Sequence, residues 1–518
     1  MSHKELAQLQ PPDEHNRELQ ANVHPTSWQN PTPQQPYHLV VIGAGTAGLV
    51  TAAGAAGLGA RVALIERELM GGDCLNVGCV PSKAIIRAAR VAATVRDAAS
   101  FGVNTRQTAA FDFAKAMERM RKVRAEISPN DSARRFSDMG IDVFFGKGSF
   151  VDEDTVRVTR DNGSTSELKF RKAVIAAGAR AAAPPINGLE SVDYLTNETL
   201  FSLTELPARF GVVGNGPIGC EMAQAFARFG SEVTLFGKGG SLLPREDPDA
   251  GDVVGQQFAR DGVRMFLDSS DMEITYTDEG IRVLFKDRGA SEAIAVDQLL
   301  IAVGRAPNTD GLNLDAVNVR HDRTGIEVND FMQTTNPRIY AAGDICSTFK
   351  FTHAADFQAR AVIQNALFAI GPFGRSNASQ LVIPWATYTT PEVAHVGMTA
   401  DAAAKANVDI DTYTQPFAGV DRAILDGQIE GFVRIHARKG TGKIIGATIV
   451  AENAGDMISE IALAMTSGIG LGKIASTIHP YPTQAEAIRK VGDQFNRTRL
   501  TTLSKTVLGF LRRMNVGR

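Results

Sequence analysis

The chain has 518 residues, of which 44% are hydrophobic and 21% are charged, the usual balance of a globular protein with several domains. Its formal net charge of -3 excludes the broad basic surface that nucleic-acid binding requires, so no nucleic-acid partner is expected. No apolar run is long enough to cross a bilayer, and residues 1–20 lack the apolar core of a secretory signal, so we expect a cytoplasmic protein.

Residues 1–36 form the first segment, which is polar, rich in Pro and Gln, and without a hydrophobic period. Such a segment buries too little apolar surface to order itself, and we predict an extended or disordered arm. His24, Pro25 and Trp28 are its candidates for docking on the rest of the chain.

A buried-strand run at residues 38–42 leads directly into a glycine-rich turn. The turn has Gly43, Gly45 and Gly48 in G-x-G-x-x-G spacing, a helix-prone segment follows, and the next strand ends in Glu66. This context is the dinucleotide-binding fingerprint. Gly43 allows the tight turn, Gly45 lets the backbone approach a pyrophosphate, and Gly48 lets helix and strand pack closely. The helix N-terminus attracts the phosphates, and Glu66 is predicted to bind a ribose hydroxyl.

Two of the chain's 4 cysteines, Cys74 and Cys79, follow in the stretch GGDCLNVGCVPSK. A zinc site needs four Cys or His ligands, and no histidine lies nearby, which disfavours metal binding. Metal binding and a purely structural disulfide are therefore the less favoured alternatives to a redox pair. Positions five apart in a regular helix rise about 7.5 Å, whereas disulfide Cα atoms lie within about 7 Å. The pair can therefore bond only in a distorted segment, which Gly78 permits, and strained or exposed disulfides are the labile ones.

The glycine pattern recurs in the middle of the chain at Gly214, Gly216 and Gly219. A strand precedes it, and a helix and a second strand follow, so a second dinucleotide is predicted. After this second strand stands Lys238, preceded by glycine instead of a carboxylate that would repel a 2′-phosphate. We therefore predict NADPH as the nucleotide, with NADH as the alternative.

Three further strands end in small residues, at Gly178, at Gly304 and just before Asp344. Glycine after a strand often lets the backbone come close to another group. From about residue 376 the pattern changes, because residues 381–450 alternate like antiparallel strands and helical segments follow. This pattern predicts a separate α+β unit.

Residues 501–518 place apolar side chains at helical spacing beside Lys505, Arg512 and Arg513. A basic amphipathic helix of this kind can lie on an anionic membrane or pack on its own dimer. Peripheral membrane contact through this tail is the less favoured of the two predictions.

The Cys-x4-Cys-x-Pro-Ser-Lys element around Cys74 and Cys79 resembles that of the pyridine nucleotide-disulfide oxidoreductases, the family of glutathione reductase, dihydrolipoamide dehydrogenase and mercuric reductase. The likeness covers about residues 37–500, and the segments GCVPSKAIIRAAR, AQAFARFGSEVTLF and SLLPREDP are most similar to mercuric reductase. The resemblance implies an α/β fold with two Rossmann-like dinucleotide-binding domains and a C-terminal α+β dimerisation domain. It also implies FAD on the first fingerprint, a nicotinamide cofactor on the second, and a homodimer.

The resemblance implies the following division of the chain: a polar arm at 1–36, an FAD-binding domain at 37–190 and 312–375, an NAD(P)H-binding domain at 191–311, a dimerisation domain at 376–500 and a basic amphipathic tail at 501–518. In this scheme electrons reach the pair through Cys79, the flavin-side sulfur, and Cys74 is the outward, attacking thiol. Asp344 lies on the ribityl chain of the flavin. Lys83 and Glu221 match a family ion pair near the reactive edge of the flavin.

The C-terminal sequence departs from the disulfide reductases of the family, which carry His-Pro-Thr-x-x-Glu with the histidine as acid-base catalyst across the dimer. Here Tyr481 stands at the histidine position and Glu486 at the glutamate position. Mercuric reductases also have tyrosine there, and Tyr194 matches their second active-site tyrosine. His479 could replace the missing histidine, although a structural role is preferred. No cysteine follows Cys346, so we do not expect the C-terminal cysteine pair of mercuric reductases. No cysteine precedes Cys74, so we do not expect their N-terminal metal-binding domain either.

These features predict an FAD-dependent oxidoreductase that passes electrons from NAD(P)H to Cys74 and Cys79 and on to an acceptor. The best candidate is Hg(II) or another metal ion, bound by the two sulfurs as a substrate. An NAD(P)H-dependent disulfide reductase or dihydrolipoamide dehydrogenase-like enzyme is the alternative. A redox-sensing flavoprotein with low turnover is the third possibility.

Overall fold

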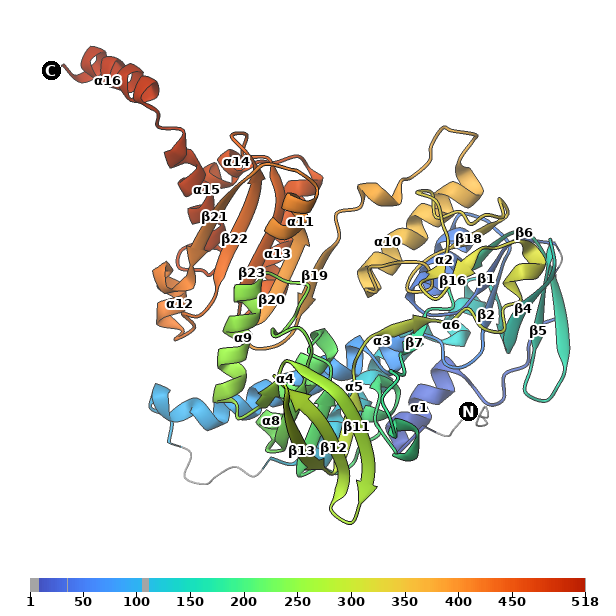
Figure 1. The fold of residues 1–518 in the computed structure, drawn as a ribbon. Helices are drawn as coiled ribbons and strands as arrows, with labels where there is room; N and C mark the ends of the chain where they lie inside the picture. Colours follow the sequence, from blue (N-terminus) through green and yellow to red (C-terminus); the bar gives the residue numbers. More distant parts are fainter. Residues whose placement is uncertain (1–8, 35, 105–110, 518) are drawn as a thin grey trace. The chain divides into compact units, whose positions relative to one another are not determined.

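The computed structural model describes residues 9–34, 36–104 and 111–517 (Figure 1). The chain forms two compact units: one comprises Met1–Gly214, Ala225–Thr234 and Ser270–Leu381, and the other comprises Asn215–Gln224, Leu235–Ser269 and Val382–Arg518. Strands and helices alternate through the dinucleotide-binding regions, so the fold is of the predicted α/β class. Within the described ranges, no helix is long and apolar enough to span a membrane.

A seven-stranded sheet is the framework of the first unit, with the order β3-β2-β1-β6-β5-β4 and with β18 also paired to β6. Its strands are β1 (Tyr37–Ile42), β2 (Val62–Glu66), β3 (Asp142–Phe145), β4 (Lys147–Asp152), β5 (Thr155–Thr159), β6 (Thr165–Ile175) and β18 (Ile339–Ala341). Strand β1 pairs in parallel with β2 and β6, whereas β5 pairs antiparallel with β4 and β6. Ligands of parallel α/β sheets bind beyond the carboxyl ends of the strands, which places the turn after β1 at a binding edge.

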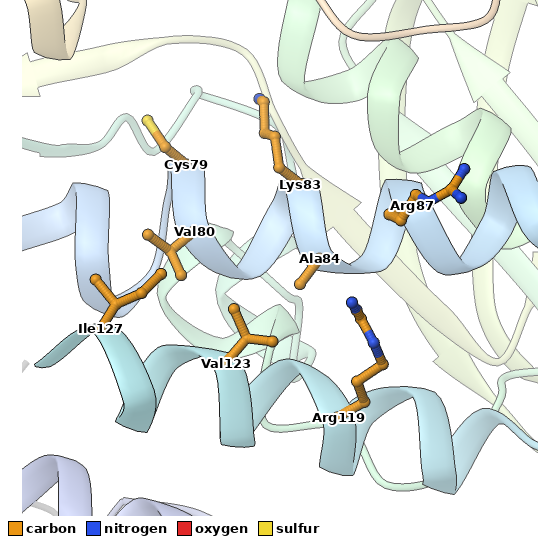
Figure 2. A pocket seen from close by; sticks show the side chains of 8 residues that line it. All are labelled: Cys79, Val80, Lys83, Ala84, Arg87, Arg119, Val123 and Ile127. Carbon is orange, nitrogen blue, oxygen red and sulfur yellow. The ribbon is translucent and has the colours of Figure 1, made fainter.

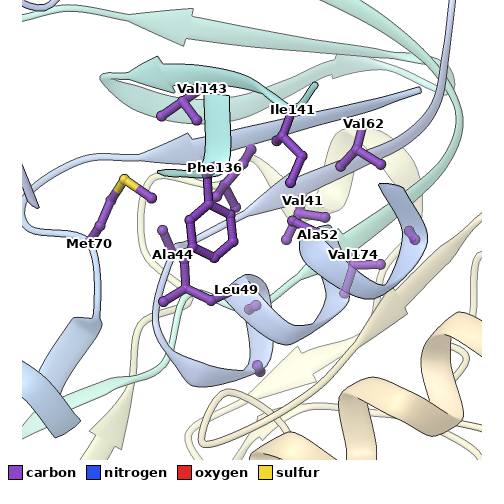
Figure 3. Packing of buried hydrophobic residues seen from close by; sticks show 14 of the residues in the cluster. Val41, Ala44, Leu49, Ala52, Val62, Met70, Phe136, Ile141, Val143 and Val174 are labelled. Carbon is purple, nitrogen blue, oxygen red and sulfur yellow. The ribbon is translucent and has the colours of Figure 1, made fainter. Parts of the chain in front are cut away.

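Helix α2 (Thr46–Gly57) packs in a buried apolar cluster with this sheet (Figure 3). Val41 of β1, Leu49 of α2, Phe136 of α6 (Ala133–Asp138) and Val174 of β6 all belong to the cluster. Strands covered on both faces appear in a sequence as continuous apolar runs, which is why residues 38–42 could be recognised as a buried strand.

The prediction of an extended or disordered arm is wrong for residues 14–23, which form helix α1 (Glu14–Val23). The Asp13 carboxylate accepts a hydrogen bond from the backbone N–H of Asn16 at 2.8 Å and also forms an ion pair with Arg121. Leu19 is fully buried. The segment has too few apolar residues to show a helical period, and tertiary contacts stabilise it instead. Residues 1–8 of the predicted arm lie outside the described residues.

Two docking candidates of the arm, His24 and Trp28, contact strand β3. The ring of His24 stacks on Phe145 with 4.1 Å between ring centroids. The indole N–H of Trp28 donates to the carbonyl oxygen of Val143 at 3.1 Å, and its backbone N–H donates to the carbonyl of Pro25. These contacts order the connection from α1 to the sheet.

The second fingerprint also has the predicted succession of elements, β8 (Arg209–Val213), α8 (Pro217–Phe229) and β9 (Glu232–Phe236). Strand β8 pairs in parallel with β14 (Gln298–Ile301) in the first unit. Strands β12 (Gly280–Asp287) and β13 (Ala290–Val296) form an antiparallel hairpin.

An antiparallel five-stranded sheet, with the order β19-β20-β23-β22-β21, is the framework of the second unit. The elements of this unit include β19 (Pro384–Thr387), β20 (Glu392–Gly397), β21 (Ile410–Pro416), β22 (Phe432–Arg438), β23 (Ile444–Ala451), α9 (Pro248–Arg260), α13 (Ala454–Thr466), α14 (Leu471–Ser476), α15 (Glu486–Thr498) and α16 (Thr502–Val516). The antiparallel pairing confirms the alternation predicted for residues 381–450. Helix α16 confirms the helical spacing of the tail and buries none of its residues; Arg518 lies outside the described residues.

Candidate active site

The turn between β1 and α2 has the geometry that its glycines predict. Gly43 has φ +103°, and a Cβ atom there would lie 2.4 Å from the carbonyl oxygen of Ala176. A Cβ atom at Gly48 would lie 1.8 Å from the carbonyl oxygen of Gly43, so the helix packs on the turn only with glycine at this position. Gly45 precedes α2 without a side-chain capping bond, which leaves the first N–H groups of the helix open to a phosphate.

Glu66, the last residue of β2, lies beside this turn. Its carboxylate oxygens accept hydrogen bonds from the backbone N–H groups of Ala44 at 2.7 Å and Glu68 at 2.8 Å. Burial raises the pKa of Glu66, and the two hydrogen bonds oppose that increase. A buried acceptor next to an open helix N-terminus fits the ribose and pyrophosphate of a dinucleotide.

Cys74 and Cys79 lie on two consecutive helical segments with a break between them. Helix α3 (Gly72–Asn76) carries Cys74, and α4 (Cys79–Asp97) begins at Cys79. The side chains of the two cysteines are hydrogen-bonded to each other, which raises the pKa of Cys74, and burial raises it further. The distortion that the five-residue spacing requires is therefore present, and the two thiols are in contact.

Gly78 occupies the break for reasons of space. A Cβ atom there would lie 2.7 Å from the carbonyl oxygen of Asp73. The chain folds back on α3 closely enough that any side chain at position 78 would collide with backbone. The predicted role of Gly78 thus has a specific cause.

Thr352, the first residue of α10 (Thr352–Ile363), is a neighbour of the pair that the sequence analysis missed. Its hydroxyl oxygen lies 3.4 Å from the sulfur of Cys79. Its hydrogen bond to Cys74 lowers the pKa of that thiol and partly opposes the effect of Cys79. Because 273 residues separate Thr352 from Cys79, no local pattern could reveal the contact.

The two other cysteines differ from the pair in their surroundings. Burial raises the pKa of Cys346 to about 12 and also raises the pKa of Cys220. Cys74 and Cys79 differ from them because their side chains are hydrogen-bonded to each other and Cys79 is exposed. The role of Cys74 and Cys79 as the reactive sulfurs stays a prediction.

Asp344 follows β18 and belongs to a group of partly buried charges near the pair. Its carboxylate lies 3.2 Å from Nε of Arg305, and the same guanidinium pairs with Asp73, the neighbour of Cys74. Burial raises the pKa of Asp344, and the positive charge of Arg305 opposes this. Arg305 thus pairs with both carboxylates next to the cysteine pair, and this charged group fits the polar atoms of a cofactor.

The second fingerprint is equally open at its strand ends. Gly214 has φ +127°, and a Cβ atom there would lie 2.3 Å from the carbonyl oxygen of Ala302. Gly216 has no atom within 4 Å of the position of a Cβ, and the same is true of Gly178 and Gly304. Gly219 is buried at the start of α8. Free space beside these backbones fits a bound nucleotide.

Asn215 explains why no acidic residue ends β9. A Cβ atom at Gly237 would lie 2.8 Å from the side chain of Asn215. The amide of Asn215 donates to the carbonyl oxygens of Lys238 at 2.9 Å and Ser241 at 2.6 Å. Asn215 thus takes the space of a side chain at position 237 and holds the backbone of the loop that carries Lys238, whose side chain is exposed.

Tyr481 and Glu486 lie on the approach to α15 in the second unit. The Tyr481 hydroxyl donates to Asp421 at 2.8 Å, which raises the pKa of this exposed phenol. One oxygen of Glu486 accepts from Arg489 at 2.8 Å. The other oxygen is buried without a hydrogen-bond partner in the described ranges, although Lys490 Nζ lies 3.9 Å away.

His479 has both ring nitrogens engaged within the second unit. Nε2 lies 3.0 Å from a carboxylate oxygen of Glu460, and Nδ1 lies 3.0 Å from the carbonyl oxygen of Thr477. Only 6% of the His479 side chain is exposed. These contacts support the structural role that we prefer for this histidine.

Lys83, Glu221 and Tyr194 have the following surroundings. Lys83 lies one turn after Cys79 on α4 and lines a pocket together with it (Figure 2). Glu221 is buried on α8, and its carboxylate accepts from the backbone N–H of Tyr388 at 2.9 Å. Three residues after the half-buried Tyr194, Asn197 donates to the carbonyl of Val77 between the two cysteines at 3.3 Å. The pairing of Lys83 with Glu221 and the role of Tyr194 stay predictions.

Comparison with known proteins identifies the class. The family described as pyridine nucleotide-disulphide oxidoreductase matches residues 37–359, and its dimerisation domain matches residues 383–491. The chain therefore belongs to the pyridine nucleotide-disulphide oxidoreductase family. Proteins of this family use FAD and NAD(P)H, and the dimerisation domain supports a homodimer.

Individual relatives have different names. A mercuric reductase of Lysinibacillus sphaericus is 35% identical over 89% of this chain and 83% of its own. A dihydrolipoyl dehydrogenase of Bacillus subtilis is 34% identical over 86% of this chain and 94% of its own. Among solved structures, the Cu(II) complex of the HOCl-induced flavoprotein disulfide reductase RclA from Escherichia coli has a TM-score of 0.78 and 29% identity, covering 89% of this chain and 100% of that one. The chain is thus an oxidoreductase that resembles mercuric reductase.

Proposed function

We propose that the protein transfers two electrons from NADPH to a metal ion bound by Cys74 and Cys79, with Hg(II) as the best candidate. The balanced reaction converts NADPH, a proton and Hg(II) held by two thiolates into NADP⁺, metallic mercury and two thiols. The observation that carries the proposal is the contact between the two sulfurs, because a pair of adjacent soft ligands suits a soft metal ion. The cytoplasm stays our expectation for its location.

The cofactor residues would act as follows. The turn with Gly43, Gly45 and Gly48 would hold the pyrophosphate of FAD, Glu66 its ribose and Asp344 its ribityl chain. When bound, FAD supplies the exchange of electrons between nicotinamide and thiols. Thr352 would orient the sulfur of Cys79, and Cys74 would carry the proton that the two sulfurs share.

The C-terminal residues favour a metal ion over a disulfide as the acceptor. Reduction of a disulfide requires a proton for the departing thiolate, and a positioned acid-base group contributes about 10²–10⁴-fold. Tyr481 stands where the family has this histidine, and hydrogen bonding to Asp421 makes its phenol a still weaker acid. A metal ion held by the pair takes up the electrons itself and has no such requirement.

Two alternatives remain, and one of them has specific support. A disulfide reductase or lipoamide-type dehydrogenase is supported by the relatives named dihydrolipoyl dehydrogenase, and His479 would then be the acid-base residue. A redox-sensing flavoprotein with low turnover is excluded if NADPH oxidation is steady with any acceptor. The nature of the acceptor separates the first two functions.

The test is a panel of acceptors, namely thiol-bound Hg(II), Cu(II), lipoamide, glutathione disulfide and quinones. We expect Hg(II)-dependent NADPH oxidation that is lost in Cys74→Ala and in Cys79→Ala. Tyr481→His should raise disulfide reduction and lower metal-ion reduction, whereas the control Tyr276→His, at a comparably exposed tyrosine, should change neither. Brisk lipoamide reduction by the wild type, abolished in His479→Ala, would refute the metal-ion function.

A further inference from the structure

A pocket of about 360 Å³ lies between helices α4 and α5 (Phe113–Ile127), with Cys79 at its rim (Figure 2). Helix α4 contributes Cys79, Lys83 and Arg87, which are four residues apart and therefore share one face. Helix α5 contributes Arg119 and, at the same four-residue spacing, the aliphatic side chains of Val123 and Ile127. The volume suits part of a small molecule better than a single ion.

Two guanidinium groups give this pocket its charge. Figure 2 shows Arg119 rising from α5 toward α4, with Arg87 on the facing helix. Both side chains are exposed, and neither has a carboxylate partner among residues 9–34, 36–104 and 111–517. Most surface arginines can be compensated by nearby acids, as Arg134 is by Asp138 four residues later at 3.0 Å. Arg87 and Arg119 instead share a hollow next to a redox-active sulfur.

We propose that this pocket binds an oxyanion, a carboxylate or a phosphate, on the molecule that exchanges electrons with the cysteine pair. The proposal rests on the proposed function in that the acceptor must reach Cys74 and Cys79. Arg87 stands eight residues after Cys79, about 12 Å along the helix axis. The anionic group is therefore part of the body of the acceptor and lies several bonds from its reacting atom.

The positive charge of Arg87 and Arg119 favours an anionic complex of a metal ion over the bare cation. A bare divalent cation is repelled by two uncompensated guanidinium groups, whereas a metal ion carried by two carboxylate-bearing thiols has net negative charge and is attracted. The expected substrate is thus a metal–thiolate complex with free carboxylates. A disulfide with carboxylates would satisfy the same pocket.

The first experiment measures the charge preference of the site without any acceptor. The NADPH-reduced protein is alkylated at low ionic strength with iodoacetate, an anion, or with iodoacetamide, its neutral counterpart, and the labelled peptide with Cys74 and Cys79 is quantified. We expect the ratio of the two rates to fall about threefold or more in the double variant Arg87→Gln/Arg119→Gln, because a charge at about 10 Å changes a local anion concentration by that order. The single variants Arg119→Gln and Arg119→Lys are compared in the same way. Arg119→Gln should lower the ratio of the two rates, whereas Arg119→Lys, which keeps the positive charge, should keep most of the wild-type ratio.

Lys122→Gln is the matched control, since this exposed cation on α5 pairs with Glu126 at 3.9 Å and does not line the pocket. It should leave the rate ratio unchanged. An equal fall in the control, or no change in the double variant, overturns the proposal, because the pocket would then exert no charge preference of its own.

The second experiment links the pocket to turnover. Hg(II) is supplied as its complex with 3-mercaptopropionate, which is anionic, or with 2-mercaptoethanol, which is neutral. The double variant should raise KM about threefold or more for the anionic complex and leave KM for the neutral complex unchanged. If neither complex is reduced, the proposed function fails while the alkylation result still decides the pocket. If both complexes are reduced with KM values that the variant does not change, the pocket proposal fails and the proposed function stands.

Discussion

Gly78→Ala tests whether the break between α3 and α4 is what makes the cysteine pair reducible. The added methyl would lie 2.7 Å from the carbonyl oxygen of Asp73, 3.1 Å from its carbonyl carbon and 3.5 Å from Cα of Cys74. These are backbone atoms, so no side chain can rotate away and α3 itself has to shift.

The magnitude follows from overpacking. Inserting a methyl group into a filled position typically costs about 1–3 kcal/mol. The same displacement moves Cys74 relative to Cys79, and a disulfide tolerates only small departures from its usual geometry. We therefore expect Gly78→Ala to lose about 1–3 kcal/mol of folding stability and to re-form its disulfide markedly more slowly than the wild type.

Two measurements on the FAD-loaded protein check this expectation. Thermal unfolding gives the change in stability, and thiol counting after removal of NADPH gives the rate at which the pair is reoxidised. Gly57→Ala is the control, because a Cβ atom at this last residue of α2 meets nothing within 4 Å. It should be neutral or slightly stabilising, as alanine is the better helix former.

The reasoning is refuted if Gly78→Ala unfolds at the wild-type temperature and reoxidises at the wild-type rate. A loss of stability with normal reoxidation would mean that the pair adjusts independently of the break. In either case the connection between the helix break and redox function would have to be abandoned.

Four further predictions concern the cofactors, the pH and the tail. The two-electron-reduced protein should show a long-wavelength charge-transfer band from the Cys79 thiolate to FAD, which Cys79→Ala should abolish and Cys74→Ala should keep. Equal loss of the band in both variants would contradict the assignment of Cys79 as the flavin-side sulfur. Lys238→Glu should raise KM for NADPH by about tenfold and KM for NADH much less, since a charge-assisted hydrogen bond to the 2′-phosphate contributes about 1.5–3 kcal/mol. If the ratio of the two KM values does not change, Lys238 is not the cause of a preference for NADPH. Burial raises the pKa of Glu246 from 4.5 to about 7, so the stability that its protonated form contributes is present below pH 4.5 and is lost as the pH rises through 7. The free energy of unfolding should therefore fall by an amount on the order of 3 kcal/mol over this range in the wild type, and Glu246→Gln should not show this fall. An unchanged pH profile in the variant would contradict the shift. The full chain and a chain cut after Arg499 should both fail to co-sediment with anionic liposomes, and sedimentation of the full chain alone would show that the tail binds membranes.

Local sequence was sufficient to predict the parts of the site that are formed by the backbone. The turn at Gly43 and Gly48 could be predicted because the steric demand of a tight strand–turn–helix leaves glycine as the only solution, and the structure has that demand at both positions. The distortion between the two cysteines could also be predicted, because a bond between positions five apart requires a distorted segment, and the break occurs at Gly78. The strands of the second unit could be predicted as short apolar segments, and β20, β22 and β23 are buried over almost their whole length.

Contacts between distant segments had to come from the tertiary structure. Helix α1 has almost no apolar period and is ordered by Arg121, an ion-pair partner more than a hundred residues away. Thr352 reaches Cys79 because α10 begins at the same edge of the sheet, which no spacing in the chain encodes. The pocket beside Cys79 has a four-residue repeat on each of two helices, and only packing shows that Arg87 and Arg119 face one hollow. Sequence thus determines local backbone geometry through sterics, whereas side chains from different elements acquire a joint function only where the fold brings them together.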